Sequence, residues 1–186
     1  MAENLNYEAE GSRCYGEVNP VLDSSQRFIT LSKAEIQANC TKYGRLYNWE
    51  TAMKSCPSGW HLPSKAEWGI LMTVVGGNAI AGKCLKAVSG WVSRSNYNGN
   101  GEDKYGFSAL PSGSISISIN NIKDSLTYFV GFFGWWWSTN ENTTDLACTL
   151  TMSFNDDIAR YRDDSKNTLY SVRCLQNATP PKGETK

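Results

Sequence analysis

The sequence has no run of basic residues, no long apolar segment and a single histidine. Lys plus Arg total 18 and Asp plus Glu total 18 in 186 residues, so the formal net charge is zero. Because binding to phosphate groups needs concentrated Lys and Arg, we expect no nucleic-acid partner. No apolar run approaches the roughly 20 residues that cross a bilayer, so we expect no membrane-spanning segment.

Charged residues are also scarce, at 19% of the chain, whereas Gly, Ser, Asn, Tyr and Trp are plentiful. This composition favours strands and long loops over a helical bundle. The length suits one domain with a core of its own. No signal peptide precedes Met1, so we expect a processed chain or a part of a longer precursor.

The cysteines form an even set without a C-x-x-C pair: Cys14, Cys40, Cys56, Cys84, Cys148 and Cys174. With one histidine and no close cysteine pair, a zinc site is not expected. Three disulfides are expected instead, and they imply an oxidising compartment. The number of cysteines alone leaves the pairing open.

The segment between Cys14 and Cys40 is polar and irregular. A disulfide between these two residues would close it at its neck and would stabilise the fold by roughly 3 kcal/mol. Within the segment, Ser32 followed by Glu35 is a capping-box pattern, which predicts a short helix through Asn39.

Two further helices are predicted on either side of a tight corner. The first uses residues 47–53 and ends before Pro57, a poor helix residue. The second begins with a capping box formed by Ser64 and Glu67. Its apolar face follows at i, i+3, i+4 and i+7 over residues 68–75.

Strands are predicted mainly in the second half of the chain. The clearest alternation of apolar and polar residues runs from Leu146 to Phe154. Other predicted strands are Ala2–Tyr7, residues 115–119, a hairpin partner at Ile158–Arg162 and a last strand at Leu169–Leu175. With helices early and strands late, the expected fold class is α+β.

Several ordered motifs resemble the Fibrobacter succinogenes major paralogous domain, often called FISUMP. They are residues 2–7, 40–49, 56–63, Glu67-Trp68, residues 81–83, 105–111, 136–138 and 171–174. The resemblance spans about residues 1–177 as a single domain and leaves 178–186 as a flexible linker or tail. The family is associated with bacterial surface and secreted proteins, commonly lipoproteins, so it implies an extracellular or surface location. It does not imply a particular activity.

The resemblance also implies a C-type-lectin-like fold. Such a fold would have two early helices packed on antiparallel sheets, long loops, and both chain ends in one sheet. It would link the first of these helices to the last strand through a disulfide, here Cys56 with Cys174. Cys84 and Cys148 would then form an additional pair.

Catalysis is not expected. His61 lies between an aromatic and an aliphatic residue at a helix corner, where a packed, hydrogen-bonded histidine is more common than a catalytic one. An oxidase similar to formylglycine-generating enzymes is an alternative, but it would need reactive thiols. In our interpretation all six cysteines have structural partners.

One segment of the sequence is a candidate for binding calcium. Asn98, Asn100 and Asp103 lie in a segment that resembles the front half of an EF-hand loop, but the twelfth position is Phe107 rather than a glutamate. The Glu-Pro-Asn and Trp-Asn-Asp signatures of sugar-binding C-type lectins are absent from the sequence. We therefore favour a turn-rich loop without a metal ion.

A ligand-binding surface is predicted on the late loops. In a strand, Trp135 and Trp137 face the side opposite Trp136. If Trp136 packs in the core, Trp135 and Trp137 can form an exposed aromatic platform; the reverse arrangement, or tryptophans that only cover the edges of the core beside a solvated hairpin, is the alternative. The polar candidates around this platform are Asn140, Asn142, Asp156, Asp157, Arg160, Tyr161 and Arg162. Aromatic, amide, carboxylate and guanidinium groups suit a carbohydrate, with plant cell-wall polysaccharide first, or a protein ligand. The alternative is a structural or assembly domain of the cell envelope.

Overall fold

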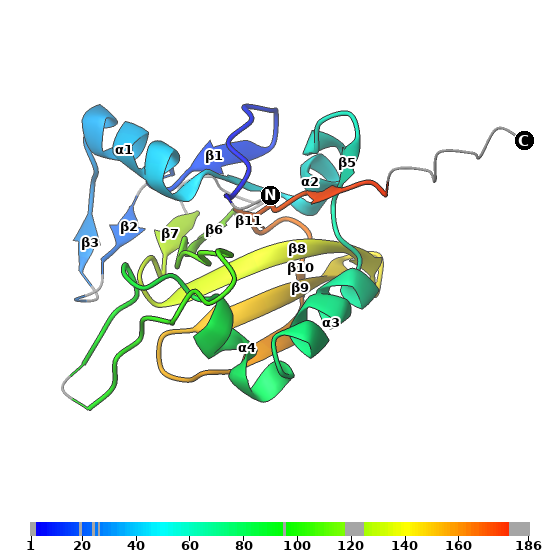
Figure 1. Ribbon diagram of the computed structural model, residues 1–186. Coiled ribbons are helices and arrows are strands. Elements are labelled where there is room, and N and C mark those ends of the chain that lie inside the picture. The colour runs from blue at the N-terminus through cyan, green and yellow to red at the C-terminus, as the bar shows by residue number, and fades with distance from the viewer. Residues whose placement is uncertain are drawn as a thin grey trace, which may run out of the picture.

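The computed structural model describes residues 3–18, 20–23, 25, 27–94, 96–117 and 125–178. Within them, a six-stranded sheet has the order β1-β4-β11-β8-β9-β10 (Figure 1). Its strands are β1 (Ser12–Cys14), β4 (Arg45–Tyr47), β8 (Phe133–Glu141), β9 (Leu146–Ser153), β10 (Ala159–Ser165) and β11 (Tyr170–Ser171). The predicted strand and its hairpin partner are confirmed as β9 and β10, which pair antiparallel. The chain is therefore mixed α+β, as expected.

Helices α3 (Lys65–Val74) and α4 (Asn78–Leu85) pack against one face of this sheet (Figure 1). The predicted capping box is present, because the Ser64 hydroxyl accepts from the Glu67 amide and the Glu67 carboxylate accepts from the Ser64 amide. Trp68 and Met72 of α3 join Trp136 and sheet residues in the first hydrophobic core. Local capping and one apolar face were sufficient to predict this helix.

The opposite face of the sheet is also covered. Helix α2 (Trp49–Ser55) and the segment after it pack there, where Leu62 joins Tyr47, Trp137 and Tyr170 in a second core. The Trp137 indole donates to the Tyr47 carbonyl at 2.7 Å. The central strands are therefore buried on both sides.

A smaller four-stranded sheet lies beside the main one, with the order β3-β2-β7-β6. Its strands are β2 (Val21–Leu22), β3 (Phe28–Ile29), β6 (Ser114–Ser116) and β7 (Leu126–Tyr128). Strand β6 confirms the start of the strand predicted at 115–119, and Ile119 lies outside the described residues. Helix α1 (Lys33–Tyr43) has its predicted capping box but ends four residues later than expected.

The two ends of the described chain meet at the main sheet. The prediction of a strand at Ala2–Tyr7 is wrong for residues 3–7, which lie outside any strand; Ala2 lies outside the described residues. The Leu5 amide nevertheless donates to the Val172 carbonyl. The predicted last strand is broken into β11 and β12 (Leu175–Gln176), and β12 pairs with β5 (Trp60–His61). The predicted tail lies outside the described residues from position 179 onward.

Two of the three expected disulfides are confirmed. Cys14 bonds to Cys40, which is 26 positions away in the sequence, and Cys56 bonds to Cys174, which is 118 positions away. The third is wrong, because Cys84 and Cys148 are free and buried.

Position along β9 explains the missing third bond. Helix α4 packs against the end of β9, since the Lys83 amide donates to the Asp157 carbonyl. From Cys148 to Ser153 the strand advances about 16 Å at roughly 3.3 Å per residue. Cys84, in α4, therefore faces the far end of the strand from Cys148.

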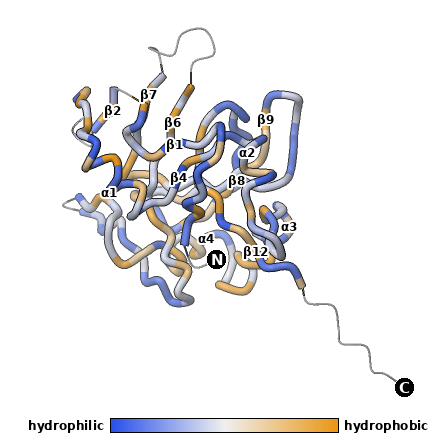
Figure 2. Tube along the Cα trace, turned by 90° about the horizontal axis from the view of Figure 1, so that it is seen from above, coloured by the Kyte–Doolittle hydropathy of each residue, from blue (hydrophilic) through white to orange (hydrophobic). Residues whose placement is uncertain are grey.

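No single helix among the described residues is long and apolar enough to cross a membrane. Helices α3 and α4 meet the length and composition criteria only as a pair, which is bent by 81° at its break. In Figure 2 the trace changes repeatedly between hydrophobic and hydrophilic segments, as expected for elements that each bury one face.

Candidate functional site

The predicted aromatic platform does not exist. Trp135 is 7% exposed, and Trp136 and Trp137 are fully buried. Trp135 stacks between Phe133 and Tyr170, with ring centroids 5.0 and 5.3 Å away. The alternation along β8 was predicted correctly, but both faces of the sheet are covered, so neither side of the strand presents its tryptophans to solvent.

The predicted polar residues do not converge. Asn140 and Asn142 lie at the β8–β9 end of the hairpin, whereas Asp156 and Asp157 lie at the β9–β10 end. Strand β9, which has 8 residues, separates the two groups, and this corresponds to about 26 Å. One small ligand cannot touch both ends.

Most of these polar groups also have internal partners. The Asn140 side chain accepts from the Lys65 amide at 2.6 Å. Asp156 pairs with Arg160 at 2.8 Å, and Asp157 accepts from the Tyr97 hydroxyl at 3.0 Å.

The remaining residues of the predicted surface lie along the edge of the sheet. Asn142 donates to the Asp163 carboxylate at 3.0 Å, and the Tyr161 hydroxyl donates to the Lys65 carbonyl at 2.8 Å. Arg162 is exposed on β10. These side chains hold the late hairpin rather than line a recess.

The asparagine-rich loop uses its oxygens internally. The Asn98 side chain accepts from the Asn100 amide at 3.1 Å, and the Asn100 side chain accepts from the Trp91 amide at 3.0 Å. The Asp103 carboxylate accepts from the amide and hydroxyl of Ser108. The loop is therefore closed by its own hydrogen bonds.

His61 connects the C-terminal end of the described chain to helix α3. Its Nδ1 lies 2.6 Å from the Asn177 side-chain oxygen and its Nε2 lies 2.9 Å from the Glu67 carboxylate. Both partners are acceptors as assigned, so the doubly protonated imidazolium satisfies them best. The contacts with Asn177 and then Glu67 raise the pKa of His61, while the Ser64 amide and then His61 lower the pKa of Glu67.

This pair makes stability depend on pH. A raised His61 pKa adds stability that is complete below its ordinary value of 6.5 and is lost as the pH rises through the folded-state pKa. A lowered Glu67 pKa adds stability above 4.5 that is lost as the pH falls. In urea titrations, the wild type should have a higher free energy of unfolding than His61→Gln. This difference should be largest between about pH 4.5 and 6.5 and should shrink toward alkaline pH. If the two proteins differed in stability by the same amount in weakly acidic and in alkaline buffer, the predicted pH dependence would be contradicted.

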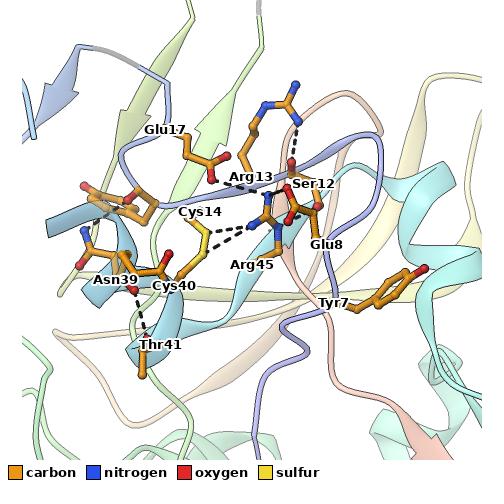
Figure 3. Close-up of a disulfide and its surroundings, with 12 residues drawn as sticks. Tyr7, Glu8, Ser12, Arg13, Cys14, Glu17, Asn39, Cys40, Thr41 and Arg45 are labelled. Atoms are coloured by element: carbon orange, nitrogen blue, oxygen red, sulfur yellow. Dashed lines mark hydrogen bonds and ion pairs between the residues drawn. A yellow bond between two sulfur atoms is a disulfide. The ribbon is translucent and has the colours of Figure 1, made fainter. Parts of the chain in front are cut away.

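Arg45 of β4 anchors the N-terminal segment against the first disulfide (Figure 3). Its guanidinium donates to the sulfurs of Cys14 and Cys40 at 3.3 and 3.7 Å, and lies 3.6 Å from the carboxylates of both Glu8 and Glu17. Cys14, Cys40 and Glu17 are close enough to resemble a metal-ligand group. Because both sulfurs are in a disulfide and a cation already lies beside them, we interpret this cluster as structural.

Tyr47 holds the same segment two residues further along β4. Its buried hydroxyl donates to the Tyr7 carbonyl at 2.7 Å and accepts from the Tyr7 amide at 2.9 Å. Thr51 of α2 donates to the Glu10 carbonyl at 2.8 Å, and the Asn48 amide donates to the Gly11 carbonyl. Residues 7–11 are thus fixed beside helix α2.

Gly11 makes this docking possible. Its φ is 82°, and a Cβ there would lie 2.4 Å from the Thr51 hydroxyl. Any other residue would be strained by its backbone and would collide with α2.

Between this segment and α2 lies an open groove of about 510 Å³. We call it the N-terminal groove; it is lined by Tyr7, Ala9, Glu10, Gly11, Asn48, Glu50, Thr51, Lys54 and Ser55. A second hollow of about 290 Å³ shares Tyr7, Lys54 and Ser55 with it and extends it past Cys56. The two hollows therefore adjoin along the same side of α2.

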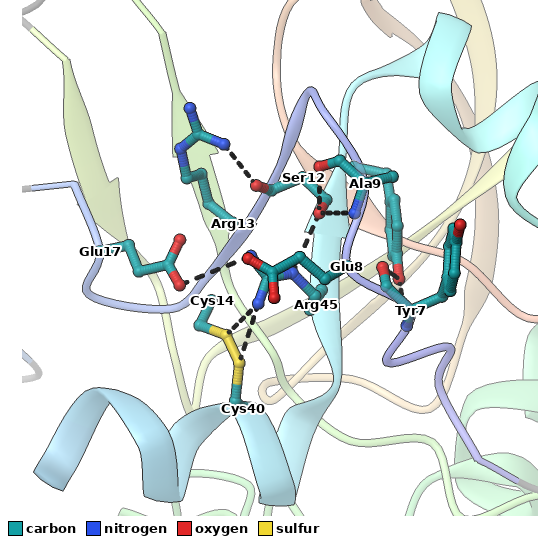
Figure 4. Close-up of polar contacts among 10 residues, drawn as sticks. Tyr7, Glu8, Ala9, Ser12, Arg13, Cys14, Glu17, Cys40 and Arg45 are labelled. Atoms are coloured by element: carbon teal, nitrogen blue, oxygen red, sulfur yellow. Dashed lines mark hydrogen bonds and ion pairs between the residues drawn. A yellow bond between two sulfur atoms is a disulfide. The ribbon is translucent and has the colours of Figure 1, made fainter. Parts of the chain in front are cut away.

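Several polar side chains of the groove have no hydrogen-bond or ion-pair partner within the described residues. Tyr7 is 59% exposed, and its ring points away from Arg45 (Figure 4). Within the described part of the chain, the side chains of Glu10, Glu50 and Lys54 form no hydrogen bond or ion pair. One flat aromatic ring, two carboxylates and an ammonium group therefore face a common space.

Sequence reasoning missed this groove. Its walls come from residues 7–11 and 48–55, and of the first wall only Tyr7 belonged to a predicted element, the strand at Ala2–Tyr7. The only local signal is that Glu50 and Lys54 are four residues apart and so share one helix face.

The family model described as Fibrobacter succinogenes major domain matches residues 1–176. No match was found among curated proteins or among solved structures.

Proposed function

Because the chain belongs to the Fibrobacter succinogenes major domain family, whose description names no activity, we propose a function from the N-terminal groove. The protein is a non-catalytic binding module that recognises a carbohydrate, with plant cell-wall polysaccharide as the first ligand class. The observation that carries this proposal is the exposed Tyr7 ring among charged side chains that have no partner within the described residues. A tyrosine ring can pack against the C–H face of a sugar, and carboxylate and ammonium groups can hydrogen-bond its hydroxyls.

We further propose a C-type-lectin-like fold. Support comes from the disulfide between the C-terminal end of α2 and Cys174, and from the contact between the N-terminal segment and the strand region at Val172.

An extracellular or bacterial-surface location is part of the proposal, because two disulfides persist best in an oxidising compartment. The absence of catalysis is also proposed. Burial raises the pKa of the Cys148 thiol, which disfavours the reactive thiolate that an oxidase would need.

The test is retention of the oxidised protein on insoluble cellulose, xylan and pectin, measured as depletion isotherms. Tyr7→Ala should weaken binding to the retained polysaccharide by about two- to tenfold, because an aromatic contact contributes roughly 0.5–1.5 kcal/mol. Its unfolding midpoint should stay close to that of the wild type, since the ring is exposed.

Tyr105→Ala is the matched control, because Tyr105 is 56% exposed and lies outside the groove. The proposal fails if no polysaccharide retains the protein, or if both tyrosine variants bind as the wild type does. Equal loss in both variants would place the binding surface elsewhere.

A further inference from the structure

We propose that a second recess, built around Arg173, binds a small molecule that carries a single carboxylate, such as an acidic sugar. This recess has a volume of about 380 Å³. Its lining consists of Glu3, Asn4, Asn6, Thr41, Lys42, Gly44, Ser108, Leu110 and Arg173. The proposal does not depend on the N-terminal groove, whose lining residues are different.

Arg173 is a buried cation held by neutral groups. It is 2% exposed; its Nε donates to the Asn4 side chain at 2.9 Å, and its two terminal nitrogens donate to the carbonyls of Phe107 and Ser108. The guanidinium carbon lies 4.1 Å from the centroid of the Phe107 ring. Among the described residues Arg173 forms no ion pair.

A buried cation without a directly paired carboxylate is unfavourable relative to the same cation in water. Burial accordingly lowers the pKa of Arg173 to about 10, and the carboxylates of Asp103 and Glu3 act in the opposite direction. Folding has already removed water from this group, so an incoming anion gains the electrostatic attraction without desolvating the arginine a second time.

The arginine also has donors left. A guanidinium carries about five N–H groups in a planar fork that matches a carboxylate, and three of them are used by Asn4, Phe107 and Ser108. Asn4 is itself fixed, because its side-chain oxygen accepts from the Trp136 indole at 2.9 Å and its nitrogen donates to the Tyr43 carbonyl. The fork is therefore held in place before a ligand arrives.

The charges of the lining favour a monoanion. Arg173 and Lys42 are positive and Glu3 is negative, so the lining carries one net positive charge. The Asp103 carboxylate, which also acts on Arg173, lies outside the lining and accepts from the Ser108 amide. The Lys42 ammonium lies 4.8 Å from the Tyr43 ring centroid and forms no ion pair in the described part of the chain. The side chains of Asn6, Thr41 and Ser108 add amide and hydroxyl groups that suit a polar body, and the volume lies within the roughly 300–1,000 Å³ typical of ligand sites.

The experiment is an NMR titration of the full oxidised chain with sodium galacturonate, with galactose, sodium acetate and inorganic phosphate as separate arms at constant ionic strength. The reporter is the indole N–H of Trp136, which shares its acceptor with Arg173. Galacturonate should shift this signal saturably and galactose should not. Saturation by acetate would identify the carboxylate alone as the ligand, and tighter binding of galacturonate than of acetate would identify the acidic sugar.

Two exposed substitutions test the charge balance without removing Arg173 from the core. Lys42→Gln should weaken galacturonate binding by roughly two- to fivefold, and Glu3→Gln should tighten it by a similar factor, as expected for exposed charge pairs. The proposal is overturned if galacturonate gives no saturable shift, if galactose or phosphate gives an equal response, or if neither variant changes the affinity.

Discussion

Replacing Trp137 with alanine should lower the free energy of unfolding by about 3–5 kcal/mol, the usual cost of removing a buried tryptophan. Trp137 is fully buried, contacts the Tyr170 ring at a centroid distance of 5.0 Å, and donates to the Tyr47 carbonyl. The variant therefore leaves a cavity and removes a buried hydrogen bond. Urea unfolding followed by tryptophan fluorescence and circular dichroism measures the loss.

Tyr105→Ala is a suitable control, because an exposed ring should change stability by no more than about 0.5 kcal/mol. If Trp137→Ala unfolded at the same urea concentration as the wild type, the two-sided core described above would be contradicted. The same result would restore the exposed aromatic platform expected from the sequence.

Replacing Cys56 and Cys174 together by alanine should cost about 5 kcal/mol, on the entropy of closing so long a loop. The bond joins residues separated by 118 positions, whereas Cys14 and Cys40 are separated by 26. The corresponding double variant of Cys14 and Cys40 should lose less, about 3 kcal/mol. Both losses are large against the roughly 5–15 kcal/mol that stabilises most domains.

Urea unfolding of the two double variants side by side tests this order. The shorter loop is the internal control, because both variants remove one disulfide and two sulfur atoms. An equal loss, or a larger loss for Cys14 and Cys40, would contradict the loop-length argument. Cys84→Ala provides a baseline for replacing a buried sulfur that is not in a disulfide.

Features set by neighbouring residues were predictable from the sequence. The capping boxes at Ser32 and Ser64 fixed the starts of α1 and α3, because their partners lie three residues away. The alternation in β9 likewise showed which residues share a face. These patterns involve only residues that are close together in the sequence, so they can be recognised without the structure.

Features set by distant residues were not predictable in the same way. Alternation along β8 places Trp135 and Trp137 on one side but does not reveal that α2 and Tyr170 cover that side. The sequence does not distinguish Cys84 and Cys148 from the paired cysteines, yet Cys84 lies in α4, which packs near the far end of β9 from Cys148. The N-terminal groove needs two segments about 40 residues apart, which are joined by the Tyr7–Tyr47 hydrogen bonds.

The position of the second disulfide also determines how the domain bears mechanical load. A force applied beyond Asn177 first meets the short β12–β5 pair and the His61 contact. It then reaches Cys174, which is bonded to Cys56 at the end of α2. Part of the tension therefore passes through the disulfide into the corner between α2 and α3. The force that would pull β11 away from β8 is reduced by that amount. A domain tethered by its C-terminal side can in this way keep its central sheet intact under shear.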